Sequence, residues 1–125
     1  MRHIMIYDPL SEIIDEPLTI DAEILKQLDV FRRRAKLINL PGVDPSDEQE
    51  RLSTLLDDLA NRLLQGVEAN PSKLWALTQF QYSLEHVERE DTEAREHFGI
   101  ELEQLMDILG IASSDGLLAN YLGGI

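Results

Sequence analysis

The fold is decided by residues 44–66, DPSDEQERLSTLLDDLANRLLQG, in which leucine recurs at the spacing of an α-helix. Residues three or four positions apart lie on one face of a helix, so these leucines predict a single apolar stripe. The stripe consists of Leu52, Leu56, Leu59 and Leu63. Asp44-Pro45 predicts the start of the helix and Gly66 its end. A helix with one apolar face needs other helices to cover that face.

Two further long helices flank this one in the sequence. Asp21 is the predicted N-cap of the preceding helix, and Pro41-Gly42 ends it. Its stripe consists of Ile24, Leu28, Phe31, Ala35 and Ile38. The following helix starts at Asn70-Pro71 and runs to about Arg89. Its stripe consists of Leu77, Phe80, Leu84 and Val87.

After Arg89 the predicted helices become shorter. Asp91 or Thr92 caps a brief helix that reaches Phe98, and Gly99 suits the left-handed position after a helix end. Residues 101–109 form another helix that stops at Gly110. A last helix over residues 117–122 has Ser113-Ser114-Asp115 as its cap and Gly123-Gly124 as its end.

The start of the chain predicts only a lead-in. Residues 2–7 alternate weakly and predict either a short strand or an extended arm. Asp8-Pro9 then predicts an N-cap and the first residue of a short helical turn, which Pro17 ends. The expected fold is therefore a single all-α domain over residues 1–125, a helical bundle of three long helices covered by shorter C-terminal helices.

The composition excludes several classes of function. The chain carries 24 acidic residues against 11 lysines and arginines, a net charge of −13, so it should repel nucleic acid and anionic membranes. Cysteine is absent, which excludes disulfides and thiolate metal sites and favours a cytoplasmic location. No signal peptide or membrane span is expected. Four cations cluster at residues 32–36, and we expect them to pair with Asp29 or other acids and to favour the end of their helix.

No motif predicts an enzyme. The sequence has no Gly-rich phosphate loop, no Gly-x-Ser-x-Gly turn and no zinc-binding His-Glu-x-x-His. Glu93, His97 and Glu101 have the spacing of ligands on one helix face, but Gly99 is expected to interrupt that helix. We therefore expect no catalytic residue, no metal and no cofactor.

The third long helix has a second group of side chains opposite its leucine stripe. Trp75, Gln79, Tyr82 and His86 fall within about 60° of one another on a helical wheel. One interpretation is that the C-terminal helices bury this aromatic stripe, because two-sided helices are usually central. The other is an exposed partner-binding surface, since Trp and Tyr are common at binding hot spots.

A run of acids follows this helix. Residues 85–107 contain nine carboxylates against Arg89 and Arg95. The run is either a solvated helix face with acids at helix N-termini, or a surface that attracts a basic partner.

Three stretches in the C-terminal half carry a resemblance: DTEARE at residues 91–96, LMDILGI at 105–111 and SSDGLL at 113–118. Over about residues 73–122 the chain resembles a family of small uncharacterised bacterial proteins. As a whole it looks like the small, acidic, helical immunity proteins that protect bacteria from toxins of contact-dependent inhibition or type VI secretion. The resemblance implies a non-catalytic protein that neutralises a cognate, basic, nuclease-type toxin by binding it.

On that interpretation, the acids steer and contact the toxin and Trp75 or Tyr82 anchors it. The candidate partner-binding residues are Trp75, Gln79, Tyr82, Glu85, His86, Glu88, Glu90, Asp91, Glu93 and Glu96. The alternative is a structural or regulatory helical protein that forms a homodimer through the aromatic stripe.

Overall fold

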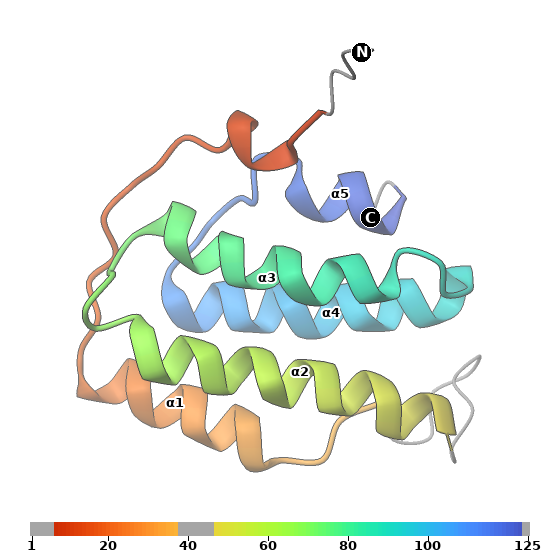
Figure 1. Cartoon of the computed structure of the whole chain (residues 1–125). Helices are drawn as coiled ribbons and strands as arrows, with labels where there is room; N and C mark the ends of the chain where they lie inside the picture. The colour runs from red at the N-terminus through yellow and green to blue at the C-terminus, as the bar shows by residue number, and fades with distance from the viewer. Residues whose placement is uncertain (1–6, 38–46, 124–125) are drawn as a thin grey trace, which may run out of the picture.

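The structure is a computed structural model that describes residues 7–37 and 47–123, and all of its regular elements in these ranges are helical (Figure 1). In chain order they are the 3-10 helix η1 (Pro9–Glu12) and the α-helices α1 (Ala22–Arg33), α2 (Asp47–Gly66), α3 (Lys73–Val87), α4 (Thr92–Leu109) and α5 (Leu117–Leu122). The predicted all-α class is confirmed.

The helices form a closed ring around one core. Consecutive helices from α1 to α4 run in alternating directions, and α4 lies behind α3 in Figure 1. Contacts join α1 to α2, α2 to α3, α3 to α5, α5 to α4 and α4 back to α1. A further contact between α2 and α4 crosses the ring. Each apolar stripe therefore faces the centre, where other helices cover it.

The predicted stripes of α2 and α3 make up much of this core. Leu52, Leu56, Leu59 and Leu63 are fully buried, as are Leu77, Phe80, Leu84 and Val87. Burying a side chain of this size stabilises the fold by about 1.5–3 kcal/mol. The leucine pattern of residues 52–63 therefore does fix the centre of the bundle.

Three of the predicted N-caps are confirmed, whereas α3 begins after the N-cap Ser72 rather than at Asn70, and the N-cap of α5 is Gly116 rather than residues 113–115. The side chains of Asp8, Asp21 and Asp91 accept hydrogen bonds from the backbone N–H groups of Leu10, Ile24 and Ala94. Gly110 and Gly123 end α4 and α5 with φ of 79° and 82°, a region that suits glycine because it has no Cβ. These local signals depend only on neighbouring backbone atoms, so they can be predicted from short stretches of sequence.

One prediction for the C-terminal half is wrong. Instead of two short helices that meet at Gly99, α4 is one continuous helix of 18 residues, longer than α1 or α3. Gly99 is buried inside it. The core residues Ala94, Phe98, Leu102, Leu105 and Leu109 continue at helical spacing across the glycine. Their burial outweighs the cost of glycine in a helix, which is about 1 kcal/mol.

The predicted first long helix is also shorter than expected. It ends at Arg33, and Ala35 is exposed rather than part of the stripe. Ile38, residues 2–6 of the expected arm and the expected cap at residues 44–46 lie outside the described residues. Tyr7, the last residue of that arm, is exposed and has no regular structure.

Segment 14–18 holds the N-terminus of α3 and forms a clamp that the sequence did not predict. The backbone N–H groups of Lys73 and Leu74 donate to the Glu16 carbonyl and the Asp15 carboxylate, both at 2.9 Å. The Lys73 side chain is only 5% exposed, and its Nζ lies 2.8 Å from Asp115 and 3.7 Å from Glu16. Asp115 also accepts a hydrogen bond from the Ile14 N–H. We call Ile14, Asp15, Glu16, Lys73 and Asp115 the N-terminal clamp.

The clamp favours the ionised state of Asp15 and Asp115. Hydrogen bonds from Leu74 and Ser72 lower the pKa of Asp15. The hydrogen bond from Lys73, and then that from Ile14, lowers the pKa of Asp115. Each carboxylate therefore stabilises the folded state at neutral pH.

Candidate protein-interaction surface

Trp75, the first residue of the predicted aromatic stripe, is half-buried against α2. A Cβ atom placed on Gly66 would overlap carbons Cζ2 and Cη2 of the indole ring. The glycine therefore allows the ring to lie directly on the end of α2. The first interpretation of the stripe expected the C-terminal helices to cover it; at Trp75 the covering helix is α2 instead.

Tyr82 lies further along the same stripe and is 52% exposed. The Arg62 guanidinium of α2 lies over its ring, 5.8 Å from the centroid. Arg62 Nη2 donates to the Gln79 carbonyl at 2.9 Å and to Ser83 Oγ at 3.0 Å. The aromatic stripe is thus partly covered, because Arg62 of α2 contacts Gln79 and Tyr82 at its centre.

Three contacts fix how α2 and α3 lie against each other. Gly66 meets Trp75, Arg62 meets Gln79, and Arg51 Nη2 lies 2.8 Å from both carboxylate oxygens of Glu90. The residue numbers of each pair add to the same total, as expected for antiparallel neighbours in one register. We call the surface along this seam the α2–α3 face. It comprises Arg51, Leu55, Asp58, Arg62, Trp75, Gln79, Tyr82, His86 and Glu90.

The α2–α3 face runs into a cluster of carboxylates at one end of the bundle, where α2 begins, α3 ends and α4 begins (Figure 1). We call this region the acidic end. Its carboxylates are Asp47, Glu48, Glu50, Glu85, Glu88, Glu90, Asp91, Glu93 and Glu96, and its cations are Arg51, Arg89 and Arg95. An open hollow lined by Asp47, Glu50, Arg51, Thr54 and Leu55 lies beside it on α2.

The predicted acids differ in what they contact. Glu85, Glu88, Glu93 and Glu96 are exposed and make no ion pair with any described residue. Glu90 is half-buried and paired with Arg51, and Asp91 caps α4. His86 is exposed next to Tyr82 on the same face of α3. The structure therefore brings the predicted aromatic and acidic residues together on adjoining surfaces.

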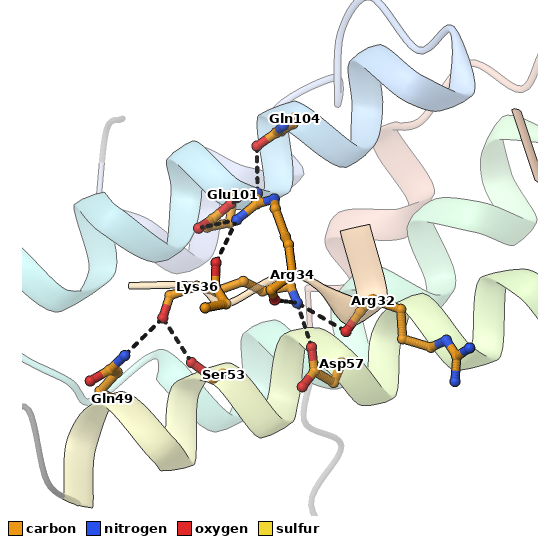
Figure 2. A network of polar contacts seen from close by, with 9 residues as sticks. Arg32, Arg34, Lys36, Gln49, Ser53, Asp57, Glu101 and Gln104 are labelled. Atoms are coloured by element: carbon orange, nitrogen blue, oxygen red, sulfur yellow. Dashed lines mark hydrogen bonds and ion pairs between the residues drawn. The ribbon is translucent and has the colours of Figure 1, made fainter. Parts of the chain in front are cut away.

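Two members of the cation cluster of residues 32–36, Arg34 and Lys36, form a partly buried polar network at the end of α1 (Figure 2). Arg34 Nη2 lies 2.5 Å from Glu101 and 2.6 Å from the Gln104 side-chain oxygen, both on α4. Lys36 Nζ lies 2.6 Å from Asp57 of α2 and donates to the carbonyls of Arg32 and Arg34. This polar network joins the end of α1 to α2 and α4.

The network neutralises the cations that could have contacted phosphate. Arg32 and Arg33 both pair with Asp29, and the hydrogen bond from Arg32 lowers the pKa of Asp29. Lys36 is 3% exposed and satisfies carbonyl oxygens at the C-terminal end of α1. The expected pairing with Asp29 and placement at the helix end are confirmed.

Three buried charged residues were not predicted: Lys36, Lys73 and Glu101. For two of them the sequence does carry a signal. Lys73 is in register with Leu77 and Phe80, and Glu101 falls between Phe98 and Leu105 on the core face of α4. A charge at a stripe position indicates a buried ion pair, because an unpaired one would be too costly.

Glu93, His97 and Glu101 do not form a metal site in the part of the chain that the structure describes. Although α4 is continuous through Gly99, Glu101 pairs with Arg34, and residues 7–37 and 47–123 contain no group of three His, Asp or Glu side chains placed to hold a metal. Within the same ranges no helix has the length and apolar character needed to cross a bilayer.

Comparison with known proteins identifies the family of the chain. No curated protein and no solved structure matches it. A family model described as a domain of unknown function, DUF4844, matches residues 19–125. This match includes the region from residue 73 to 122 for which the sequence resembled an uncharacterised family. Since the model covers most of the chain, the protein belongs to the DUF4844 family.

Proposed function

We propose that the protein is a non-catalytic binding protein, a bacterial immunity protein that neutralises a cognate basic toxin in the cytoplasm. The observation that carries the proposal is the acidic end, which contains nine carboxylates but only three arginines and lies next to the exposed Tyr82. Clustered carboxylates repel one another and lower stability, so such a cluster is retained where its field has a use.

The arrangement suits rapid capture of a positively charged protein. Attraction between opposite fields raises association rates to about 10⁸ M⁻¹s⁻¹ at low salt. Glu85, Glu88, Glu93 and Glu96 are exposed and lack ion pairs among the described residues, so they are available to arginines and lysines of a partner. In a nuclease toxin such cations bind the phosphates of the substrate, and carboxylates placed there exclude it.

The α2–α3 face supplies the second element of an interface. Tyr82 offers a flat aromatic surface with a polar end, and the Arg62 side chain that lies over it is fixed by two hydrogen bonds. Tyrosine and arginine are the residues that most often dominate binding energy. Charged residues around them act mainly on encounter and specificity.

The test is protection of cells. Immunity proteins are encoded beside their toxins, so the neighbouring gene is expressed with and without this protein, and growth is measured. We expect the wild-type protein to restore growth. The acidic-end variant, with Glu85, Glu88, Glu93 and Glu96 all changed to lysine, should fail to do so.

A matched-charge variant provides the control. Glu12, Glu23, Glu68 and Glu103 are exposed and lie outside the acidic end, so changing them to lysine alters the net charge equally. This variant should still protect. If the neighbouring gene product is not toxic, or if both variants protect as well as the wild type, the proposal is wrong.

A homodimer through the exposed Tyr82 is the second candidate function. Self-association would bring two acidic ends of the same sign near each other, which opposes it. Light scattering decides between the two: a dimer that Tyr82→Ala dissociates would favour a structural or regulatory protein.

A further inference from the structure

Arg62 differs from Arg32, Arg34 and Arg51 because neutral oxygens fix it in place and it forms no ion pair with a described residue, although the negative charge of Asp58 lies near it. Its Nη2 atom is held by the Gln79 carbonyl and Ser83 Oγ. Arg32, Arg34 and Arg51, in contrast, each lie within 3 Å of a carboxylate oxygen. No carboxylate in the described ranges pairs with Arg62.

The guanidinium is also partly removed from water. Its Nε atom is buried and has no hydrogen-bond acceptor among the described residues, whereas Nη1 has no acceptor but is not buried. Burial lowers the pKa of Arg62, which the nearby negative charge of Asp58 opposes. An arginine stays charged at neutral pH in spite of such a shift, so this cation lacks part of its solvation.

The chemistry of the missing partner follows from the charge of the group and from the one nitrogen left to donate. Nη2 is occupied and Nε is buried, so Nη1 donates to the ligand, and a charge-assisted hydrogen bond to a carboxylate is stronger than one to a neutral acceptor. The surrounding surface is acidic, with Asp58 and Glu85 on the adjoining helix faces, and this disfavours a doubly charged phosphate more than a singly charged carboxylate. Tyr82, half exposed beside the cation, provides an apolar surface for a neighbouring side chain.

We propose that Arg62 and Tyr82 form a carboxylate-binding subsite that receives an Asp, Glu or C-terminal carboxylate of the partner protein, next to an apolar side chain of that partner. The inference rests on the proposed function, because the partner is the protein that the acidic end attracts. Nη1 is the atom that the carboxylate reaches, and the negative charge also compensates the buried Nε.

The subsite would provide specificity that the acidic end lacks. Any basic protein is attracted by exposed carboxylates, whereas only a partner with a carboxylate at the right position satisfies Arg62. A partner without it would leave the cation further desolvated under the interface, which penalises binding.

The test uses small probes and the full chain, with no need of the partner. N-acetylphenylalanine carries a carboxylate beside an aromatic ring, N-acetylphenylalaninamide lacks the charge, and phenyl phosphate carries a different anion. Each is titrated into ¹⁵N-labelled protein, and the Arg62 Nε–H and Gln79 and Ser83 amide signals are followed by NMR. We expect saturable shifts with the carboxylate at a Kd of about 1–10 mM. The amide should bind at least about 5-fold more weakly.

Variants assign the binding to Arg62. Arg62→Gln should abolish the saturable shifts, and Arg62→Lys, which keeps the charge but cannot bind Gln79 and Ser83 and also donate from a separate nitrogen, should weaken binding several-fold. Arg89→Gln removes an exposed arginine of the neighbouring acidic end and should change nothing. Thermal unfolding checks that each variant is folded, and the backbone spectrum of Arg62→Lys shows whether α2 and α3 keep their register.

Three outcomes would overturn the subsite: equal binding of the uncharged amide, shifts that persist in Arg62→Gln, or tighter binding of phenyl phosphate. These outcomes are separate from those of the growth test. If the carboxylate binds at Arg62 but no neighbouring toxin is neutralised, the proposed function is wrong and the subsite stands. If the toxin is neutralised but no probe binds, the subsite alone is wrong.

Discussion

The cations of the polar network at the end of α1 differ in their partners from Arg62 on the α2–α3 face. In the network, Lys36 and Arg34 are held by Asp57 and Glu101, and both cations lie near the Phe31 ring. On the α2–α3 face, Arg62 lies over Tyr82 and pairs with no carboxylate of residues 7–37 or 47–123. In the first region Arg34 and Lys36 each have a carboxylate partner in the chain, whereas Arg62 has neutral hydrogen-bond acceptors and only the nearby charge of Asp58.

The difference shows how a structural charge is told apart from a candidate binding residue. A charge whose partners all come from the same chain joins elements of the fold, as Lys36 joins α1 to α2. A charge that is fixed and desolvated without a counter-ion suggests a ligand from outside. Substitutions in the two regions should therefore affect different properties, stability in the first and binding in the second.

The largest effect on stability is expected from Asp57→Ala. This substitution removes the carboxylate that neutralises Lys36, whose side chain is 1% exposed. The Asp57 side chain is 42% exposed, and Lys36 keeps the carbonyls of Arg32 and Arg34 as acceptors, so the loss should cost about 2 kcal/mol of unfolding free energy rather than the full cost of breaking a buried pair. Asp58→Ala, at the exposed next position, should change the unfolding free energy by less than about 0.5 kcal/mol. Urea unfolding measures both, and equal effects would contradict the distinction.

The next largest effect concerns the packing of Trp75. Gly66→Ala places a methyl group where the indole ring lies. The overlap should destabilise the protein by about 1 kcal/mol net, since overpacking costs more than alanine contributes to helix propensity. In a Trp75→Leu background the same change should become neutral or stabilising. If Gly66→Ala destabilises both backgrounds equally, the ring does not rest on α2 as described.

A smaller, pH-dependent effect is expected at the N-terminal clamp. The hydrogen bond from Lys73 lowers the pKa of Asp115 below its usual 3.8. Its carboxylate therefore contributes stability above that value, and the contribution is lost as pH falls through the lower pKa of the folded state. The wild type should be more stable than Asp115→Asn at pH 7, and the two should converge near pH 2. A difference that stays constant across this range would exclude the ionised pair as its cause.

The smallest effect on stability is expected from Tyr82→Ala. Because the ring is 52% exposed, its loss should change the unfolding free energy by less than about 0.5 kcal/mol. Binding of a protein partner should nevertheless weaken at least about 10-fold, as for a hot-spot aromatic residue. Urea unfolding and calorimetric titration with the neighbouring gene product measure the two effects. A large loss of stability would place Tyr82 with the structural residues instead.

Local signals were the part of this fold that the sequence allowed us to predict. Asp21 and Asp91 mark the start of α1 and α4, and Gly110 marks the end of α4, as expected. A cap can be predicted because it depends on only a few adjacent residues. Gly99 was wrongly predicted to end a helix. It is helical because Phe98 and Leu102, on either side of it, are buried in the core. That burial depends on helices distant in sequence, and a local rule does not include it.

In the candidate site, too, the local positions of the residues could be predicted from the sequence, whereas their burial could not. The wheel position of Trp75, Gln79, Tyr82 and His86 correctly placed them on one side of α3, but their burial could not be known from that helix alone. It depends on α2, where Gly66 makes room for Trp75 and Arg62 extends over Tyr82. Arg62 itself gave no signal, because a single arginine at the edge of a leucine stripe is common on exposed helices.

The association rate with the product of the neighbouring gene tests the central claim most directly. It is measured by stopped flow at low and at physiological salt for the wild type, the acidic-end variant and the matched-charge variant. We predict that the acidic-end variant associates at least about 10-fold more slowly at low salt and loses most of the salt dependence, with a smaller change in the matched-charge variant. If the acidic-end variant associates as fast as the wild type at both salt concentrations, the acidic end does not exist to capture a basic protein.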